Sequence, residues 1–358
     1  MKIEDFDKNL KVDTDITEPD LVWFNVRELP FVIYGVLYDE EQGCYLRVPQ
    51  ETANGISKGV RGGLNRHTAG GRVRFRTNSQ YIAIRAVMDH VKNMSHMPLT
   101  GQSGFDLYHV VEGRDTYYRS FVPPRDLTDG YSSGIFTPRE MTDYTINFPL
   151  YDGVKELYVA IKHDAQLAAP TPYQHEKPIV YYGSSITQGG CASRPGNSYQ
   201  AMLSRTLGVD HVNLGFSGNG LGEPEMAAYI ATLDMSIFVM DYDSNAPSEE
   251  WLRNTHYPFY RIIRDAQPTL PIVFVSNPGI LLRPILPSGD RRVRREIIRE
   301  TYERALAAGD QNVYFIDGAE IFAGDAWDAC TVDGGHPNDL GFYRFACRFE
   351  ETLRPILR

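Results

Sequence analysis

Four short segments in the second half of the sequence carry the residue types that acyl transfer by a serine requires. They are Gly183-Ser184-Ser185, Ser217-Gly218-Asn219, Asp243-Ser244-Asn245 and Asp333-Gly334-Gly335-His336-Pro337. This chemistry needs a hydroxyl nucleophile, an imidazole base, a carboxylate that fixes the tautomer of the imidazole, and N–H donors aimed at the oxyanion. The four segments offer a candidate for each role.

Ser185 is the candidate nucleophile, because it follows an apolar run at a strand-to-helix turn where a hydroxyl can be exposed and its own N–H can face the site. His336 would take the proton of Ser185 and return it to the leaving alkoxide. Asp333, three residues earlier, can fold back onto the other ring nitrogen. For the oxyanion hole, Gly218 offers an unobstructed backbone N–H and Asn245 offers a side-chain NH₂.

The serine and the histidine each have a structural alternative. Ser185 alone could be a turn residue or helix N-cap, and Ser184 could be mistaken for the nucleophile. His336 could be a surface or capping histidine. His109 also follows an aspartate, Asp106, by three residues, but it lies in a strand-like stretch, whereas His336 precedes a predicted helix start.

The oxyanion candidates have alternatives as well. Gly218 and Gly220 could serve a tight strand-to-helix turn, a role that is compatible with donating an amide. Asn245 could cap the helix that begins near Pro247. We assign Gly218 and Asn245 to the oxyanion hole because each follows a predicted strand.

Motifs for cofactors fail on inspection. GSSITQGG has no lysine where a phosphate-binding loop requires one, and the glycines near Gly218 run GxxGxG, which is not the dinucleotide fingerprint. Asp333, His336 and Asp339 could ligate a metal, but Asp339 fits the first turn of a helix, where its charge is favourable. We therefore expect no cofactor and no metal.

The elements that must position these segments form a repeating pattern. The apolar runs IVYYG, HVNLGF, IFVMDY, PIVFVSN and VYFID alternate with helical patterns, which predicts a doubly wound parallel sheet. Ligands of such sheets bind beyond the carboxyl ends of the strands, so the four segments should meet at one rim. Two helices are clear in the pattern. One is predicted to bury Trp251, Phe259, Ile262 and Ile263, and the last to bury Phe342, Phe345, Ala346, Phe349 and Leu353.

The first half of the sequence has a different pattern. From about residue 31 to 162, short period-two runs separated by Gly, Pro, Asn and Asp clusters predict an antiparallel β-sandwich without a convincing amphipathic helix. The proline-rich segment 164–178 is typical of a domain junction. We therefore expect a jelly-roll-like β-sandwich domain over residues 1–166 and an α/β/α domain over 167–358.

The four segments resemble the SGNH or GDSL hydrolases, a family named for Ser, Gly, Asn and His in four separate blocks. The resemblance implies a three-layer α/β/α fold, no metal and hydrolysis of small esters. YYGSSITQGGCASRPGNSY and the upstream GFDLY (residues 104–108) resemble the GxDLY-type subgroup with an N-terminal β-sandwich, for which deacetylation of carbohydrates is a frequent suggestion. The sequence departs from the family pattern at Ser184, where an Asp is usual, and at Ser244-Asn245-Ala246, which lacks the usual glycine.

Composition limits the partners. The net charge of −10 gives no basic footprint for nucleic acid or an anionic membrane surface. The N-terminus lacks the pattern of a secretory signal, and no run approaches the roughly 20 apolar residues of a membrane helix. We expect a cytoplasmic protein without nucleic-acid or membrane partners, whose four cysteines are free thiols.

The expected function is that of a serine esterase. It would hydrolyse short-chain acyl esters, acetyl above all, on a small molecule or an oligosaccharide through an acyl-Ser185 intermediate. Two alternatives remain open: a non-catalytic carbohydrate-binding protein, and a lipase or thioesterase for longer acyl chains. We expect GFDLY to dock the two domains and Arg194 to be a solvated loop residue.

Overall fold

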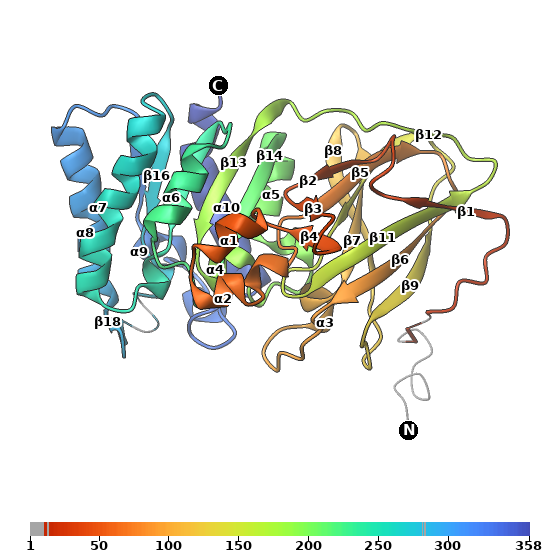
Figure 1. The fold of residues 1–358 in the computed structure, drawn as a ribbon, viewed down its shortest axis with the longest axis horizontal. Coiled ribbons are helices and arrows are strands. Elements are labelled where there is room, and N and C mark those ends of the chain that lie inside the picture. The colour runs from red at the N-terminus through yellow and green to blue at the C-terminus, as the bar shows by residue number, and fades with distance from the viewer. Residues whose placement is uncertain (1–10, 13, 281, 283) are drawn as a thin grey trace.

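The computed structural model describes residues 11, 12, 14–280, 282 and 284–358. The chain forms antiparallel sheets followed by a parallel sheet with helices on both faces (Figure 1). Within these described residues, no helix has both the length and the apolar character needed to cross a membrane. The predicted fold class, an α/β/α sheet preceded by a β-sandwich-like domain, is confirmed.

The antiparallel half consists of two main sheets that face each other across one apolar core. The first has the order β1 (Leu21–Asn25), β11 (Gly153–Lys162), β6 (Tyr81–Asp89) and β9 (Gly130–Phe136). The second has the order β12 (Leu167–Ala168), β5 (Arg72–Thr77), β10 (Thr142–Asn147), β7 (Phe105–Val111) and β8 (Arg114–Phe121), with β2 (Val32–Tyr34) also on β5. Alternate residues such as Val73 and Phe75 of β5 and Ile82 and Ile84 of β6 fill the core. The period-two pattern of the sequence therefore marks the inward-facing side chains.

The parallel sheet has the order β14 (Val209–Gly215), β13 (His175–Gly183), β15 (Ile237–Asp241), β16 (Ile272–Val275) and β19 (Val313–Ile316). The five predicted runs are all strands of this sheet. The first strand, β13, lies between the second and the third, so the chain winds in opposite directions from it. Gly183 pairs with both Gly215 and Asp241, which aligns the carboxyl ends of three strands. This alignment creates the crevice in which such sheets bind ligands.

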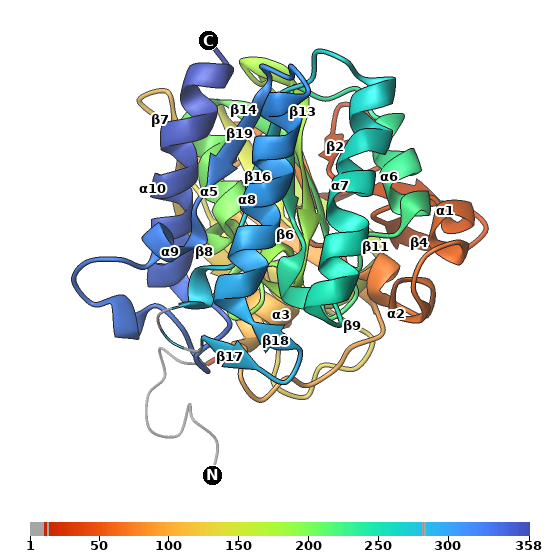
Figure 2. The same ribbon diagram turned by 90° about the vertical axis from the view of Figure 1, so that its left-hand side faces the viewer.

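Helices cover the two faces of this sheet (Figure 2). One face carries α6 (Pro224–Ala231), α7 (Glu249–Ala266) and α8 (Arg291–Ala307), and the other carries α5 (Tyr199–Leu207) and α10 (Asp339–Ile356). The five predicted core residues of α10 are all buried. The prediction for Trp251 of α7 was wrong: its side chain is 42% exposed, and its indole N–H donates to the carbonyl of Leu221 at 2.7 Å. Leu252, the next residue, is buried instead.

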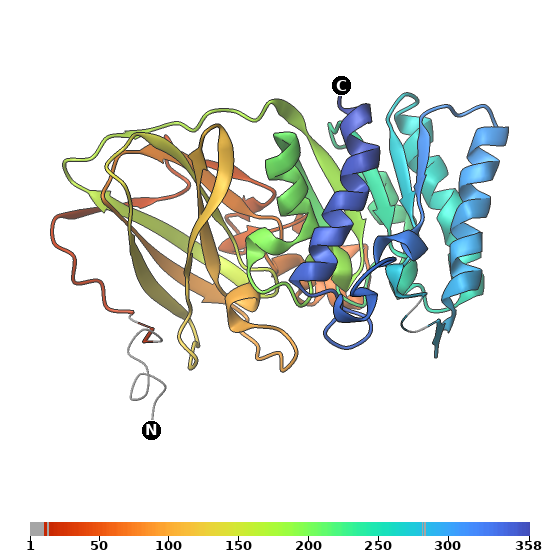
Figure 3. The same cartoon turned by 180° about the vertical axis from the view of Figure 1, so that it is seen from behind.

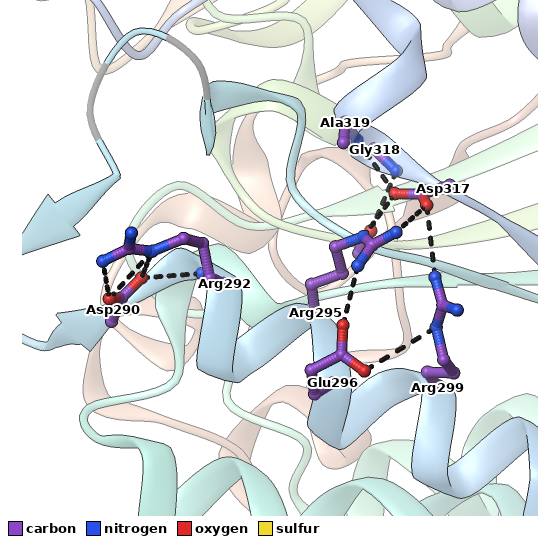
Figure 4. Close-up of polar contacts among 9 residues, drawn as sticks. Asp290, Arg292, Arg295, Glu296, Arg299, Asp317, Gly318 and Ala319 are labelled. Carbon is purple, nitrogen blue, oxygen red and sulfur yellow. Dashed lines mark hydrogen bonds and ion pairs between the residues drawn. The ribbon is translucent and has the colours of Figure 1, made fainter.

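An ion-pair network fixes α8 to the end of β19 (Figure 4). Arg295 donates to Asp317 at 2.7 Å, and Arg299 approaches the same carboxylate at 3.4 Å. Glu296 lies between the two arginines. Asp317 also caps α9 (Gly318–Ile321) by accepting the N–H of Ala319. One carboxylate thereby holds a helix start and a neighbouring helix together.

The antiparallel half also contains very short helices that periodicity does not reveal. They are α1 (Gln50–Asn54), α2 (Lys58–Arg61), η3 (Leu64–Arg66) and α3 (Leu99–Gln102). Figure 1 shows α1 and α2 against the α/β half, and Figure 3 shows α3, in orange, near the lower end of α10. Gly59 of α2 leaves no room for a Cβ beside Asn219, and Thr100 Oγ1 donates to the carbonyl of Ser193 at 2.6 Å. These segments bring the N-terminal half close to the nucleophile loop.

The GFDLY segment docks the two halves, as predicted. Asp106 has no exposed surface and accepts hydrogen bonds from the backbone N–H of Gly196 and the side chain of Asn147, each at 2.8 Å. Arg194 donates to the same carboxylate at 3.2 Å and stacks on Tyr117, 3.8 Å from the ring centroid. The prediction of a solvated Arg194 was wrong, because its partners lie in the other domain.

Replacing Asp106 should destabilise the protein strongly. Asp106→Ala leaves a guanidinium, an amide and a carboxamide without their acceptor, and we expect the free energy of unfolding to fall by about 3–5 kcal/mol. Asp164→Ala, which breaks an exposed ion pair with Arg139, is the matched control and should cost about 1 kcal/mol or less. Urea denaturation followed by circular dichroism measures both, and equal losses would contradict a docking role for Asp106.

Candidate active site

The nucleophile turn distinguishes its two serines. Ser184 is the N-cap of α4 (Ser185–Gln188), and its hydroxyl accepts the N–H of Ile186 at 3.2 Å. The hydroxyl of Ser185 is instead 2.9 Å from Nε2 of His336. Ser184, at the position where the resemblance led us to expect an aspartate, therefore supports the turn, while Ser185 faces the imidazole.

Asp333 and His336 form a hydrogen-bonded pair. Nδ1 of His336 lies 2.8 Å from Oδ2 of Asp333, while Oδ1 accepts the backbone N–H groups of His336 and Gly335 at 2.7 and 2.9 Å. Burial alone would raise the pKa of Asp333, but these hydrogen bonds outweigh it and lower the pKa to about 2. The ionised carboxylate holds the proton on Nδ1, which leaves Nε2 as an acceptor for the Ser185 hydroxyl.

The loop that carries His336 leads into α10 and is held by contacts of its own backbone. Asn338 is the N-cap of α10, so Pro337 lies directly before the helix. Pro337 pairs with Thr331 in an isolated antiparallel bridge, and Val332 donates its N–H to the carbonyl of His336 at 2.9 Å. The loop closes on itself, and these contacts hold the backbone of His336 in place.

The two oxyanion candidates are free to donate. Gly218 has φ +67°, and no group in the described part of the chain accepts its N–H. Asn245 accepts the N–H of Gly220 through Oδ1 at 3.2 Å, and its NH₂ has no acceptor among the described residues. Asn245 does not cap α7, since Ser248 is the N-cap of that helix. The capping alternative for Asn245 is thereby excluded.

Close glycine contacts bring these segments onto the nucleophile loop. A Cβ on Gly220 would lie 2.3 Å from the carbonyl oxygen of Gly183, so the turn that contains Gly218 can pack here only with glycine at position 220. The N–H of Phe216 donates to the same carbonyl at 2.9 Å. Because Asn245 bonds to Gly220, the second and third segments share one rim with Ser185.

Gln188, which the sequence analysis missed, connects three loops. Its Nε2 donates to Nδ1 of His67 at 2.9 Å and to the carbonyl of Leu150 at 3.0 Å, while its Oε1 accepts the N–H of Ser217 at 2.9 Å. Burial lowers the pKa of His67 to about 3, so this imidazole is neutral and can accept. Two of these partners belong to the N-terminal half, and no local sequence signal reveals them.

The N-terminal half also reaches the reacting serine. The hydroxyl of Tyr151 donates to the backbone carbonyl of Ser185 at 3.1 Å. A pocket of about 600 Å³ opens beside it. Its lining comes mainly from N-terminal residues between 58 and 94, and Ser217 and Asn219, on either side of Gly218, complete it. A substrate group next to the oxyanion donors would contact both halves.

One cluster in the described residues could hold a metal ion. The ligand atoms of His96, Cys191 and His336 lie within 4.8 Å of one another. Both ring nitrogens of His336 already bond to Ser185 and Asp333, so a metal would break one of these hydrogen bonds. Asp339, the other acidic candidate ligand, accepts from the backbone and hydroxyl of Ser193. We assign the metal cluster no catalytic role.

Comparisons with known proteins identify a family for each half of the chain. Residues 176–354 match the GDSL-like lipase/acylhydrolase family, and residues 21–167 match the N-terminal domain of SGNH-hydrolase-type esterases, called GxDLY. No curated protein matches the sequence.

Solved structures share the architecture over nearly the whole chain. A protein described as a GDSL-like lipase from Bacteroides ovatus ATCC 8483 is 28% identical, with a TM-score of 0.83 over 94% of this chain and 98% of that one. The salicylyl-acyltransferase SsfX3 from a tetracycline biosynthetic pathway is 21% identical, with a TM-score of 0.76 over 95% and 98%. A family two carbohydrate esterase from Clostridium thermocellum, in complex with cellohexaose, is 15% identical, with a TM-score of 0.56 over 81% and 93%. The family match covers half of the chain, and this protein therefore belongs to the GDSL-like lipase/acylhydrolase family, as an SGNH-type esterase with a GxDLY N-terminal domain.

Proposed function

We propose that the protein releases short acyl groups, acetyl above all, from carbohydrate esters, with Ser185 as nucleophile, His336 as base and Asp333 as its orienting carboxylate. One observation carries the assignment of these roles: the continuous chain of hydrogen bonds from Asp333 through His336 to Ser185, at 2.8 and 2.9 Å. Such a chain is the arrangement that activates a serine hydroxyl.

Acylation follows from this geometry. The Ser185 oxygen attacks the ester carbonyl as its proton passes to Nε2 of His336, and the carbonyl oxygen becomes an oxyanion. The N–H groups of Ser185 and Gly218 and the NH₂ of Asn245 donate to that oxyanion. The tetrahedral intermediate collapses, the bond to the leaving alcohol breaks, and the imidazolium protonates the alkoxide.

Deacylation repeats these steps with water. His336 takes a proton from a water molecule, whose oxygen attacks the acyl-Ser185 carbonyl. The second tetrahedral intermediate releases the carboxylic acid, and Ser185 recovers its proton from the imidazolium. Asp333 stays ionised throughout, because its hydrogen bonds lower its pKa to about 2, well below neutral pH.

Two observations support a carbohydrate ester as the substrate. Among proteins of this fold are the esterase solved with cellohexaose and an acetyl xylan esterase from Butyrivibrio proteoclasticus, with TM-scores of 0.56 and 0.55. The pocket of about 600 Å³ beside the Gly218 turn has room for a group much larger than acetyl. A sugar-sized group in that pocket is consistent with both observations.

Transfer of the acyl group to an alcohol instead of water is a second candidate function. It is favoured by the likeness to a salicylyl-acyltransferase at a TM-score of 0.76 over 95% of the chain. Transfer would use the same acyl-Ser185 and the same proton acceptor. Product analysis with and without added sugar alcohol distinguishes the two, because hydrolysis yields free acid in both cases and transfer yields a new ester.

The substrate and the nucleophile can be tested together. We expect the wild type to release acetate from acetylated oligosaccharides and 4-nitrophenyl acetate, and Ser185→Ala to lower kcat roughly 10⁴-fold or more. Ser184→Ala removes a cap worth about 1 kcal/mol and should keep measurable activity. A chain-length series of 4-nitrophenyl esters is the companion measurement. A rate that rises with chain length would favour a lipase or thioesterase, and binding without turnover would favour a carbohydrate-binding protein.

Asn245→Ala tests the oxyanion assignment. Loss of one preorganised donor should lower kcat by roughly 10²–10³ and change KM little, because the donor acts on charge that develops in the transition state. Asn254→Ala, on the exposed face of α7, is the matched control and should behave like the wild type. Steady-state kinetics on 4-nitrophenyl acetate give both constants, and a purely KM effect would argue against this role.

Asp333→Asn tests the carboxylate. The lowered pKa of Asp333 means that its carboxylate orients the His336 imidazole fully above about pH 4. This effect disappears only as the pH falls through about 2. Protonation of Asp333 should therefore cause no loss of wild-type activity above about pH 4. Asp333→Asn should lower kcat roughly 10⁴-fold across pH 5–9. Asp328→Asn changes an exposed residue of the same loop and is the control, which should behave like the wild type. Wild-type activity in Asp333→Asn, or recovery of this variant at high pH, would overturn the assignment.

A further inference from the structure

The pocket beside the Gly218 turn has cationic groups and no carboxylate in its lining. Lys58 comes from α2, and Lys92 comes from the loop that follows β6. In the described part of the chain, no carboxylate oxygen lies within 4.0 Å of either ammonium group, unlike Lys177, which pairs with Asp234 at 2.8 Å. Two unpaired cations thus face one pocket of a chain whose net charge is −10.

The surroundings of Lys92 show that its charge acts on the pocket. Burial lowers the pKa of His67, which lines the pocket, and the charges of Arg47 and Lys92 lower it further. The acid near Lys92 is Asp152, which is buried and already accepts from the Lys92 backbone and from the side chains of Gln102 and Ser103. The Lys92 charge opposes the rise that burial causes in the pKa of Asp152, but the two groups form no ion pair within 4.0 Å, so the ammonium group stays available to a ligand.

We propose that this pocket binds a negatively charged group of the substrate, a carboxylate or a phosphate, between Lys58 and Lys92. The inference rests on the proposed esterase function, because Ser217 and Asn219 line the pocket and flank Gly218, the proposed oxyanion donor. A protein of net charge −10 repels anions at long range, and local cations in a concave site offset this repulsion. The substrate class is then an acidic ester, such as an acetylated sugar acid or sugar phosphate.

Matched pairs of synthetic esters test the proposal and locate the anion. Mono-4-nitrophenyl succinate against 4-nitrophenyl butyrate places the charge on the acyl group, and 4-acetoxybenzoate against 4-acetoxybenzamide places it on the alcohol. We expect the wild type to prefer the anionic member of one pair in kcat/KM, and this preference to shrink as salt rises from 0.05 to 0.5 M, as screening requires.

Lysine variants show whether the preference comes from this pocket. Lys58→Gln and Lys92→Gln should each reduce the anionic-to-neutral ratio of kcat/KM by about threefold to fivefold, and the double variant should abolish the preference. Lys177→Gln makes the same charge change far from the pocket and should keep the wild-type ratio. A ratio that stays unchanged in the double variant, or no anionic preference in either pair, overturns the proposal.

A binding measurement separates this inference from the proposed function. Succinate and 4-hydroxybenzoate are titrated into Ser185→Ala protein by calorimetry, with and without the two lysine substitutions, so that no turnover is needed. Binding that depends on both lysines supports the anion site even if hydrolysis fails. Hydrolysis that depends on Ser185, without lysine-dependent binding or preference, leaves the esterase and removes the anion site.

Discussion

The buried side chain of Gln188 is the contact on which the arrangement of this site depends. A primary amide can donate twice and accept twice, and Gln188 uses both donors on His67 and Leu150 and one acceptor site on Ser217. All four groups lie where unpaired polar atoms are costly, since each loss leaves about 1–3 kcal/mol uncompensated. The hydrogen bonds of Gln188 therefore couple α4, the turn that contains Gly218 and the N-terminal domain.

Local hydrogen bonds also explain how the site accommodates its departures from the family pattern. Ser184 supplies the cap that supports the nucleophile turn. Ser244, where glycine was expected, accepts a hydrogen bond from Asn277, so the third segment is anchored to the loop after β16. Asn245 accepts from Gly220 through its side-chain oxygen, and its NH₂ has no acceptor among the described residues. Ser184 and Ser244 thus supply local support at two positions where the family pattern has other residues.

Much of the α/β half could be predicted from the sequence, because its signals are local. Apolar runs mark the strands, and polar residues directly after them must lie at the carboxyl edge, so the four segments could be brought together without coordinates. The exposed Trp251 and the paired Arg194 were missed because their partners, Leu221 and Asp106, are distant in sequence. Gln188 was missed for the same reason, and α1, α2 and α3 are too short to show a period.

The reaction type and the substrate specificity depend on different kinds of sequence signal, the first local and the second distant. The reacting groups come from loops at the ends of neighbouring strands, whose alignment Gly183, Gly215 and Asp241 fix, so acyl transfer can be inferred from motif order. The pocket wall comes from short N-terminal segments that no motif marks. Its two lysines lie near the turn that contains Gly218 because Gly59 packs against Asn219 and brings α2 to that turn. A change in those segments can alter which ester enters without touching Ser185, His336 or Asp333, so specificity in this architecture is free to diverge while the reaction is retained.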